Sequence, residues 1–77
     1  MAKSFIRNKI RTYRFHTGEM TQQELAEKVG VTRQTIVAIE HEKYSPSLEL
    51  AFRIARVFNV PLEEIFTYHY ENNKKNK

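Results

Sequence analysis

The feature that most constrains this chain is a pair of short helical segments joined by a turn that contains a glycine. The sequence Thr21-Gln-Gln-Glu24 has the form of a capping box, in which the Thr21 hydroxyl accepts from the Glu24 N–H and the Glu24 carboxylate reaches back. Gly30 predicts the end of this helix, because glycine takes the left-handed backbone conformation without steric cost. Thr32 can cap a second helix. Helices joined by so short a turn cross at about 90–120°, which predicts a helix-turn-helix over residues 21–41.

The second of these helices carries side chains suited to reading bases. Ile36 and Ile39 form its apolar face, whereas Arg33 and Gln34 lie on other faces of its first turn. An arginine can grip guanine O6 and N7 with two hydrogen bonds, and a glutamine can do the same for adenine N6 and N7. Ala38 is small enough to let the helix sit deep in a groove. The plainer interpretation of these polar residues is a solvated helix face.

A further helix is expected before this pair. Ile6, Ile10 and Tyr13 follow one another at the spacing of one helix face, which predicts a helix over residues 6–16 that Gly18 ends.

Two more helices are expected after the pair. Ser47 predicts the start of a fourth helix, which is apolar nearly all round over residues 48–58. One small domain cannot cover every face of such a helix, so Phe52 and its neighbours are expected to form a surface for self-association. Pro61 at its first position predicts a short fifth helix.

The two ends of the chain differ from the helical middle. Residues 66–70 alternate in the manner of a short strand, and a lone strand needs a partner for its backbone groups. That partner could be the stretch 3–7, which would make a small β-ribbon beside the helices. Residues 71–77 are polar and are expected to be a disordered basic tail. The division is therefore one domain over residues 1–70, with a terminal dimerisation segment, and a tail.

The charge is unevenly distributed along the 77 residues. Residues 1–33 hold seven Lys or Arg and three Glu, a net charge of +4, whereas residues 34–70 hold three and five, a net charge of −2. A polyanion would therefore meet the front half, and the middle is better suited to protein contacts. The chain contains no cysteine and no apolar run that approaches a membrane span, so we expect a cytoplasmic protein with no membrane partner.

The sequence does not favour catalysis or a bound cofactor. No nucleophile–base pair or glycine-rich phosphate loop is present, which predicts a non-enzyme without cofactors or an evident small-molecule ligand. His16, His41 and His69 are scattered, and the triplet Glu40-His41-Glu42 does not lie on one helix face. No metal site is expected.

The middle of the chain resembles a known family. The segment TQQELAEKVGVTRQTIVAIEHEKYSPSLELAFRIARVFNVPLEEIF is similar to the lambda-repressor/Cro-like helix-turn-helix family, and the resemblance covers about residues 6–66. It implies an all-α, five-helix DNA-binding domain of the small stand-alone type.

The resemblance also implies roles for individual residues. Base contacts, or contacts to the adjoining backbone, are implied for four residues: Thr32, Arg33, Gln34 and Ala38. Phosphate contacts are implied for Gln22 and Lys43, and a buried ion pair for Arg14 and Glu40. The chain has His41-Glu42 where the family usually has Asn-Gly, which predicts a different shape at the end of the recognition helix and a negative charge near the phosphates.

We therefore expect a sequence-specific regulator of transcription, a repressor that reads a palindromic operator in double-stranded DNA as a homodimer. The alternative is an antitoxin that mainly blocks a protein partner. The short remainder beyond residue 66 offers little room for such a partner-binding segment.

Overall fold

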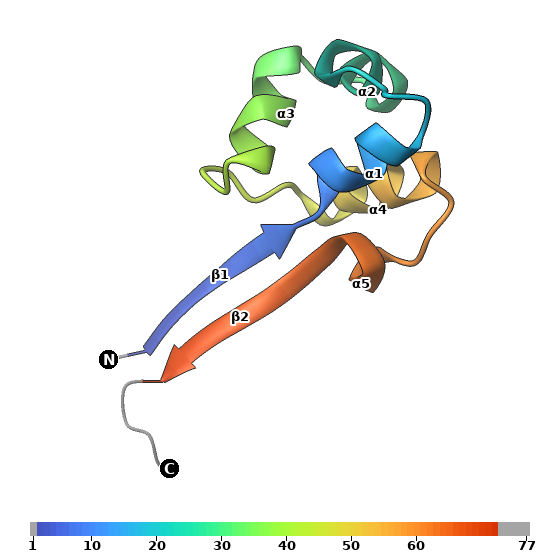
Figure 1. The fold of residues 1–77 in the computed structure, drawn as a ribbon. Coiled ribbons are helices and arrows are strands. Elements are labelled where there is room, and N and C mark those ends of the chain that lie inside the picture. The colour runs from blue at the N-terminus through green and yellow to red at the C-terminus, as the bar shows by residue number, and fades with distance from the viewer. Residues whose placement is uncertain (1, 73–77) are drawn as a thin grey trace.

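The computed structural model describes the backbone of residues 2–72 and the side chains of residues 5–70. A strand leads into five helices, and a second strand returns beside the first (Figure 1). The elements are, in order, β1 (Ala2–Asn8), α1 (Ile10–His16), α2 (Gln22–Val29), α3 (Arg33–Glu40), α4 (Leu48–Val57), α5 (Leu62–Ile65) and β2 (Phe66–Asn72). The five-helix prediction is confirmed, and so is the β-ribbon from the two ends of the chain.

The ribbon projects from the helices as an antiparallel pair (Figure 1). Its register places Phe5 opposite His69, Ile6 opposite Tyr68 and Arg7 opposite Thr67. Because side chains alternate across a strand, Phe5, Arg7, Thr67 and His69 share one face. The other face is more apolar, with Ile6, Phe66, Tyr68 and Tyr70.

The first helix starts later than predicted. Residues 6–8 belong to β1, and α1 begins at Ile10. The spacing of Ile6 and Ile10 suits a helix, but β2 offers residues 2–8 a complete partner for their backbone groups. Asn8 then marks the change of structure, since its side-chain oxygen accepts from the Ile10 N–H at 3.2 Å.

The local signals that start the middle helices work as predicted. Thr21 and Glu24 form the reciprocal capping box, with distances of 2.8 and 3.0 Å. The hydroxyls of Thr32 and Ser47 cap α3 and α4. Gly30 ends α2 in the left-handed conformation, with φ of 80°. The angle between α2 and α3 is therefore set by short-range chemistry.

Two boundaries near the C-terminus differ from expectation by one or two residues. Pro61 is the N-cap of α5 and not its first helical residue. β2 continues to Asn72, two residues into the segment that was expected to be a tail, because Ala2 and Lys3 are there to pair with it. The rest of the expected tail, residues 73–77, lies outside the described residues.

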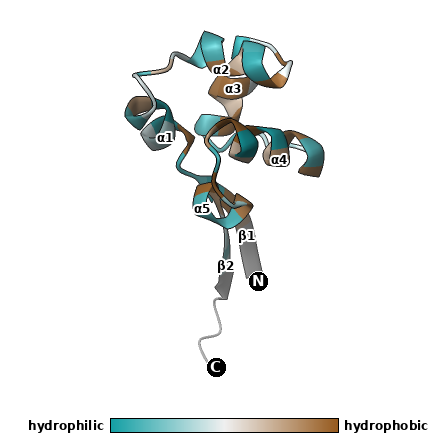
Figure 2. Ribbon diagram, turned by 90° about the vertical axis from the view of Figure 1, so that its right-hand side faces the viewer, coloured by the Kyte–Doolittle hydropathy of each residue, from teal (hydrophilic) through white to brown (hydrophobic). Residues whose placement is uncertain are grey.

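The hydrophobic core lies between the helices, each of which carries both apolar and polar residues (Figure 2). Its largest fully buried side chains are Ile10, Leu25, Ile36, Ile39, Ile54 and Ile65. α4 buries Ile54 on one side but leaves Leu48 68% and Phe52 54% exposed. Phe52 is thus exposed as the sequence predicted. The expectation of a helix that is apolar nearly all round is wrong, because Glu49, Arg53 and Arg56 are exposed on the same helix and make it amphipathic. Among the described residues, no helix is both long and apolar enough to cross a bilayer.

Candidate nucleic-acid interface

The exposed face of α3 carries most of the residues expected to read bases. Arg33 and Gln34 are exposed in its first turn, and Ala38 is half-buried one turn further on. Ile36 and Ile39 are fully buried on the opposite face. The core thus fixes the rotation of α3 about its own axis, and this rotation presents the two long polar side chains to solvent.

Thr32 has a structural task as well as an expected contact. Its hydroxyl accepts from the Thr35 N–H at 3.2 Å and lies 3.1 Å from the Thr35 hydroxyl. The cap therefore holds the Thr32 side chain at the N-terminus of α3, where the free N–H groups of a helix favour an anion.

A buried ion pair locks α3 to α1. Arg14 donates from Nε to Glu40 Oε2 at 2.7 Å and from Nη2 to Oε1 at 3.0 Å, and its Nη1 donates to the Met20 carbonyl at 2.8 Å. The side chains of Arg14 and Glu40 are only 13% and 7% exposed. Two parallel hydrogen bonds between these groups fix direction as well as distance. This Arg14–Glu40 ion pair, called here the strut, therefore connects α1 to α3 behind the exposed face of α3.

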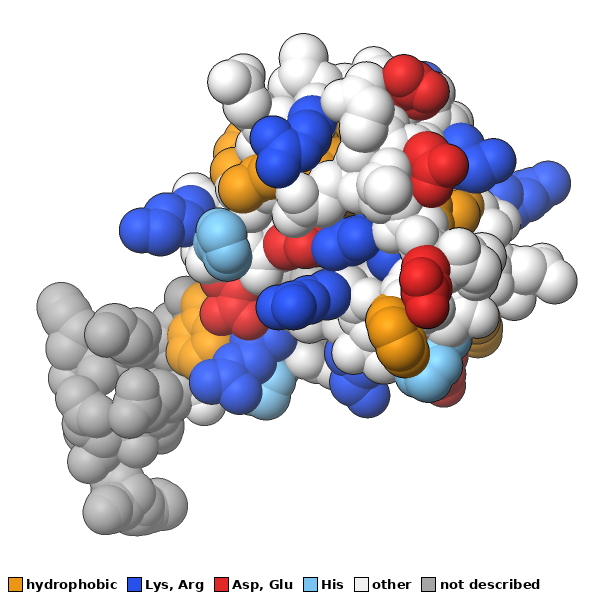
Figure 3. Space-filling model, turned by 45° about the horizontal axis from the view of Figure 1, so that its top comes forward, with side chains coloured by type: hydrophobic (Ala, Val, Ile, Leu, Met, Phe, Trp, Pro, Cys, Tyr) orange, Lys and Arg blue, Asp and Glu red, His pale blue; other side chains and the backbone are white. Residues whose placement is uncertain are grey.

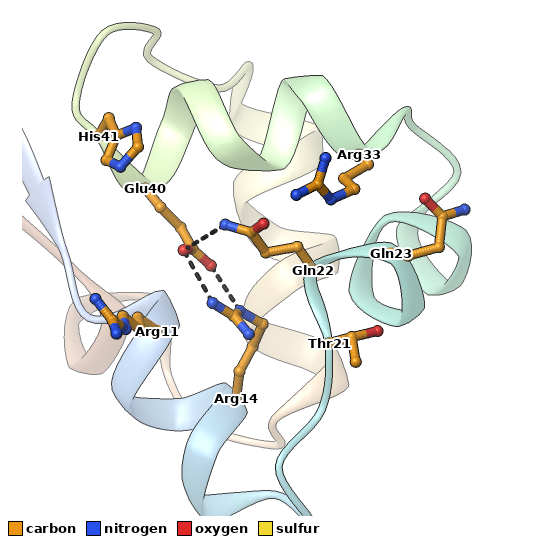
Figure 4. Close-up of a pocket in the computed structure, with 8 residues that line it drawn as sticks. All are labelled: Arg11, Arg14, Thr21, Gln22, Gln23, Arg33, Glu40 and His41. Atoms are coloured by element: carbon orange, nitrogen blue, oxygen red, sulfur yellow. Dashed lines mark hydrogen bonds and ion pairs between the residues drawn. The ribbon is translucent and has the colours of Figure 1, made fainter.

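Gln22 extends this strut to α2. Its Nε2 donates to Glu40 Oε1 at 3.1 Å, so one carboxylate joins the first, second and third helices (Figure 4). Sequence reasoning assigned Gln22 only to a phosphate and missed this bond. The Gln22 amide still has one N–H, which could be given to a phosphate. Nothing in the local sequence reveals the bond, because Gln22 and Glu40 are 18 residues apart.

These residues line an open pocket on the same side of the molecule. Arg33 lies beside Gln22, whereas Arg11 and His41 flank the other side of the ion pair (Figure 4). Sequence reasoning left Arg11 out. Among the described side chains no carboxylate is within ion-pair distance of Arg11 or Arg33. The pocket combines these cations with the N-terminus of α2, and both features attract phosphate.

The end of α3 keeps a geometry that usually needs glycine. Glu42 has φ of 61°, its N–H donates to the Ile39 carbonyl at 2.9 Å, and the Lys43 N–H donates to the Ala38 carbonyl at 2.9 Å. This is the Schellman pattern, with Glu42 in the left-handed position. The expectation of a differently shaped helix end is wrong, because the backbone bonds hold the turn without glycine. Lys43 follows as an exposed side chain.

Charged side chains gather on this face of the molecule. Figure 3 shows Lys, Arg and His side chains spread across this view, with several acidic side chains among them. Among the described residues no three His, Asp or Glu side chains are grouped as metal ligands would be. The exposed cations of the pocket, Arg11 and Arg33, are groups on this face that a polyanion can contact.

The comparison with known families decides the identity. A family model described as helix-turn-helix matches residues 17–65, which include the capped pair α2 and α3 and the helix α4. The chain belongs to the lambda-repressor/Cro-like helix-turn-helix family. Members of this family are DNA-binding regulators of transcription and not enzymes.

Helix-turn-helix relatives match three quarters or more of this regulator. An uncharacterized HTH-type transcriptional regulator of Methanocaldococcus jannaschii is 55% identical over 64 residues, which are 82% of this chain and 94% of the relative. One from Archaeoglobus fulgidus is 54% identical over 86% of this chain and 93% of its own. The cryptic phage CTXphi transcriptional repressor of Vibrio cholerae is 34% identical over 75% of this chain and 51% of its own.

A solved structure shows the same fold. The crystal structure of a candidate DNA-binding protein from Bacteroides fragilis superposes with a TM-score of 0.69 and 26% identity, covering 80% of this chain and 98% of that one.

Proposed function

We propose that this helix-turn-helix regulator is a cytoplasmic repressor that binds a palindromic operator as a homodimer, with α3 in the major groove. The observation that carries the proposal is the exposure of Arg33 and Gln34 on a helix that Glu40 ties to both neighbouring helices. Base readout needs long donors and acceptors at fixed positions, and the strut supplies the fixed position. The similarity to a phage repressor supports repression as the outcome.

The proposal assigns a role to each of the contacting residues. Arg33, Gln34 and Ala38 face the bases, with Thr32 at the edge where bases meet backbone. Gln22 and Lys43 hold the phosphates on either side of α3 and so set its register on the duplex. Gln22 does this with the one N–H that Glu40 leaves free.

The homodimer is supported by apolar surface away from this face. Leu48 and Phe52 are exposed on α4, and Tyr68 and Tyr70 are 65% and 56% exposed on the ribbon. In a two-fold dimer the recognition helices would lie one DNA turn apart, about 34–36 Å, and the operator would be a palindrome.

The proposal is tested by selecting bound duplexes from a random DNA library and measuring affinities for the selected sequence and a scrambled duplex. Arg33→Ala and Gln34→Ala should each weaken the selected duplex by about 1–3 kcal/mol and relax the preference at one position. Lys43→Ala should weaken both duplexes about equally. Lys28→Ala, exposed at the far end of α2, is the matched control and should change neither affinity.

Dimer formation and repression of transcription are tested in separate experiments. Sedimentation at micromolar concentration should give twice the mass of 9.2 kDa, and Phe52→Ser should shift the protein towards monomer. The selected duplex, placed across a reporter promoter, should lower transcription when the protein is present. If Arg33→Ala binds every duplex as the wild type does, α3 does not read bases in the groove. If the protein is a monomer at all concentrations, it does not bind as a homodimer.

A further inference from the structure

The end of the ribbon that joins the helices carries a second group of polar side chains, which is distinct from the pocket beside α3. Arg7, Lys9, Thr67 and His69, called here the ribbon cluster, line an open hollow of about 410 Å³ together with Asn8 and Glu42. None of the residues in the ribbon cluster was among the DNA-contacting residues predicted from the sequence. Three of its members bear nitrogen donors and the fourth a hydroxyl, which is a set that suits phosphate oxygens.

Contacts with the Phe5 ring restrain two members of the ribbon cluster, Arg7 and His69. The Phe5 and His69 rings stack with centroids 5.5 Å apart and an angle of 11° between planes, and the Arg7 guanidinium lies 5.4 Å from the centre of the Phe5 ring. The Thr67 hydroxyl lies 3.1 Å from His69 Nε2. Because both neighbours of Phe5 are fixed by contact with its ring, the donors of Arg7 and His69 lose less side-chain entropy when they bind.

One asparagine fixes the ribbon cluster relative to the recognition helix. Asn8 Nδ2 donates to the Ile39 carbonyl in the last turn of α3 at 2.8 Å, while its Oδ1 accepts from the start of α1. The Lys9 N–H donates to the Ile65 carbonyl at 2.9 Å. When α3 lies in the groove, the ribbon cluster is therefore placed at a set position beyond the C-terminal end of that helix.

The charges of the hollow favour an anion. Arg7 and Lys9 are exposed cations, and among the described side chains neither has a carboxylate within ion-pair distance. Among the side chains that the structure describes, Glu42 is the one carboxylate that lines the hollow, and it enters from the loop after α3. Of the described side chains that line the hollow, two are cations, one is a histidine and one is a carboxylate.

We propose that the ribbon cluster is a second contact to the DNA backbone, in which Arg7 and Lys9 bind phosphates beyond the C-terminal end of α3. The inference rests on the proposed docking of α3 in the major groove. It assigns the ribbon two faces with different tasks: the polar face meets DNA, and the apolar face with Tyr68 and Tyr70 is left for a second copy of the chain. Such contacts add affinity for any sequence and carry no base preference.

The test measures how affinity depends on salt. For wild type, Arg7→Ala and Lys9→Ala, the binding constant is measured by anisotropy from 50 to 300 mM KCl on the selected duplex and on a scrambled duplex of equal length. Each variant should reduce the slope of log K against log salt by about 0.9, which is roughly eightfold in affinity at 0.1 M, on both duplexes alike. Glu42→Gln should tighten both duplexes, because it removes the negative charge from the hollow and keeps the side chain's size.

Control variants separate the loss of a phosphate contact from a loss of folding and from a failure of α3 to bind DNA. Arg7→Lys keeps the charge and should keep the slope, even if the contact with the Phe5 ring is weakened. Lys28→Ala should have the wild-type slope, and circular dichroism melts should show each variant folded. If Arg7→Ala and Lys9→Ala are folded and keep the wild-type slope, the ribbon cluster does not touch DNA. If the wild type itself selects no sequence, the docking of α3 fails instead.

Discussion

The helical body, α1 to α5, and the ribbon are stabilised in different ways. In the body, isoleucines from four of the five helices are fully buried together, and Arg14 and Glu40 are paired almost out of contact with water. In the ribbon, none of the described side chains is fully buried, and Tyr68 is 65% exposed. A two-stranded ribbon is at best marginally stable alone in water. The contrast indicates that the body stabilises itself, whereas the ribbon depends on the body and on whatever it binds.

The largest expected effect tests the strut inside the body. Glu40→Ala would leave the Arg14 guanidinium buried without its partner and should lower the free energy of unfolding by about 3–5 kcal/mol. For a chain of 77 residues this is a large part of a total of roughly 4–12 kcal/mol. Urea unfolding followed by circular dichroism measures the change.

The chain offers a matched control for this variant. Arg53 and Glu49 form a second ion pair at 2.8 Å, but their side chains are 53% and 76% exposed. Glu49→Ala should therefore cost no more than about 1 kcal/mol. Equal losses for the two alanine variants would mean that burial does not distinguish the pairs.

A smaller effect tests the local signals that start the recognition helix. Thr32→Ala removes the hydroxyl that accepts from the Thr35 N–H and should cost about 1 kcal/mol. Thr32→Ser keeps that hydroxyl and should stay within a few tenths of wild type. Urea midpoints of the two variants that coincide would show that the cap does not support α3.

A gain of stability is expected at the end of the same helix. Glu42 holds a left-handed conformation that glycine takes more easily, so Glu42→Gly should raise the free energy of unfolding by up to about 1 kcal/mol. Glu42→Gln keeps the strain and should be neutral in the same urea experiment. A destabilised glycine variant would mean that the flexibility of the unfolded chain outweighs the relief of strain.

The smallest effect is expected in the ribbon. Tyr68→Thr keeps a residue suited to a strand and removes an exposed ring, so it should change stability at low protein concentration by no more than about 0.5 kcal/mol. The wild-type melting temperature should rise with protein concentration if the ribbon helps to join two copies, and this rise should be smaller in the variant. A loss of several kcal/mol at low concentration would show that the ribbon is part of the core after all.

The sequence predicts the body better than the ribbon for the same physical reason. Caps such as Thr21, Thr32 and Ser47 act over three residues, and the apolar spacing of α2 and α3 acts over a few turns, so both can be read locally. The sequence places the start of α1 too early, because Ile6 belongs to a strand. Its partner in that strand pair is Tyr68, about sixty residues away in the chain.

The candidate site shows the same limit. Arg33 and the ion pair between Arg14 and Glu40 follow from a motif. The bond from Gln22 to Glu40 and the anchoring of Asn8 to Ile39 do not, because they join separate parts of the chain. Lys3, Phe5 and Arg7 do alternate charge with an aromatic ring, which is typical of a strand face and could have drawn attention to the ribbon cluster.

Glu42 has a consequence for the speed of finding a target. Proteins of this size slide and hop along DNA, and the time spent at each wrong position grows with the strength of the contacts that ignore sequence. If the ribbon cluster binds the DNA backbone as proposed, the Glu42 carboxylate in the hollow would weaken those contacts everywhere on the duplex. At the right sequence, the bonds that Arg33 and Gln34 make to bases would compensate for it. Glu42 would thus shorten the residence time at each wrong site during the search. The affinity of the final complex would then come mainly from the recognition helix.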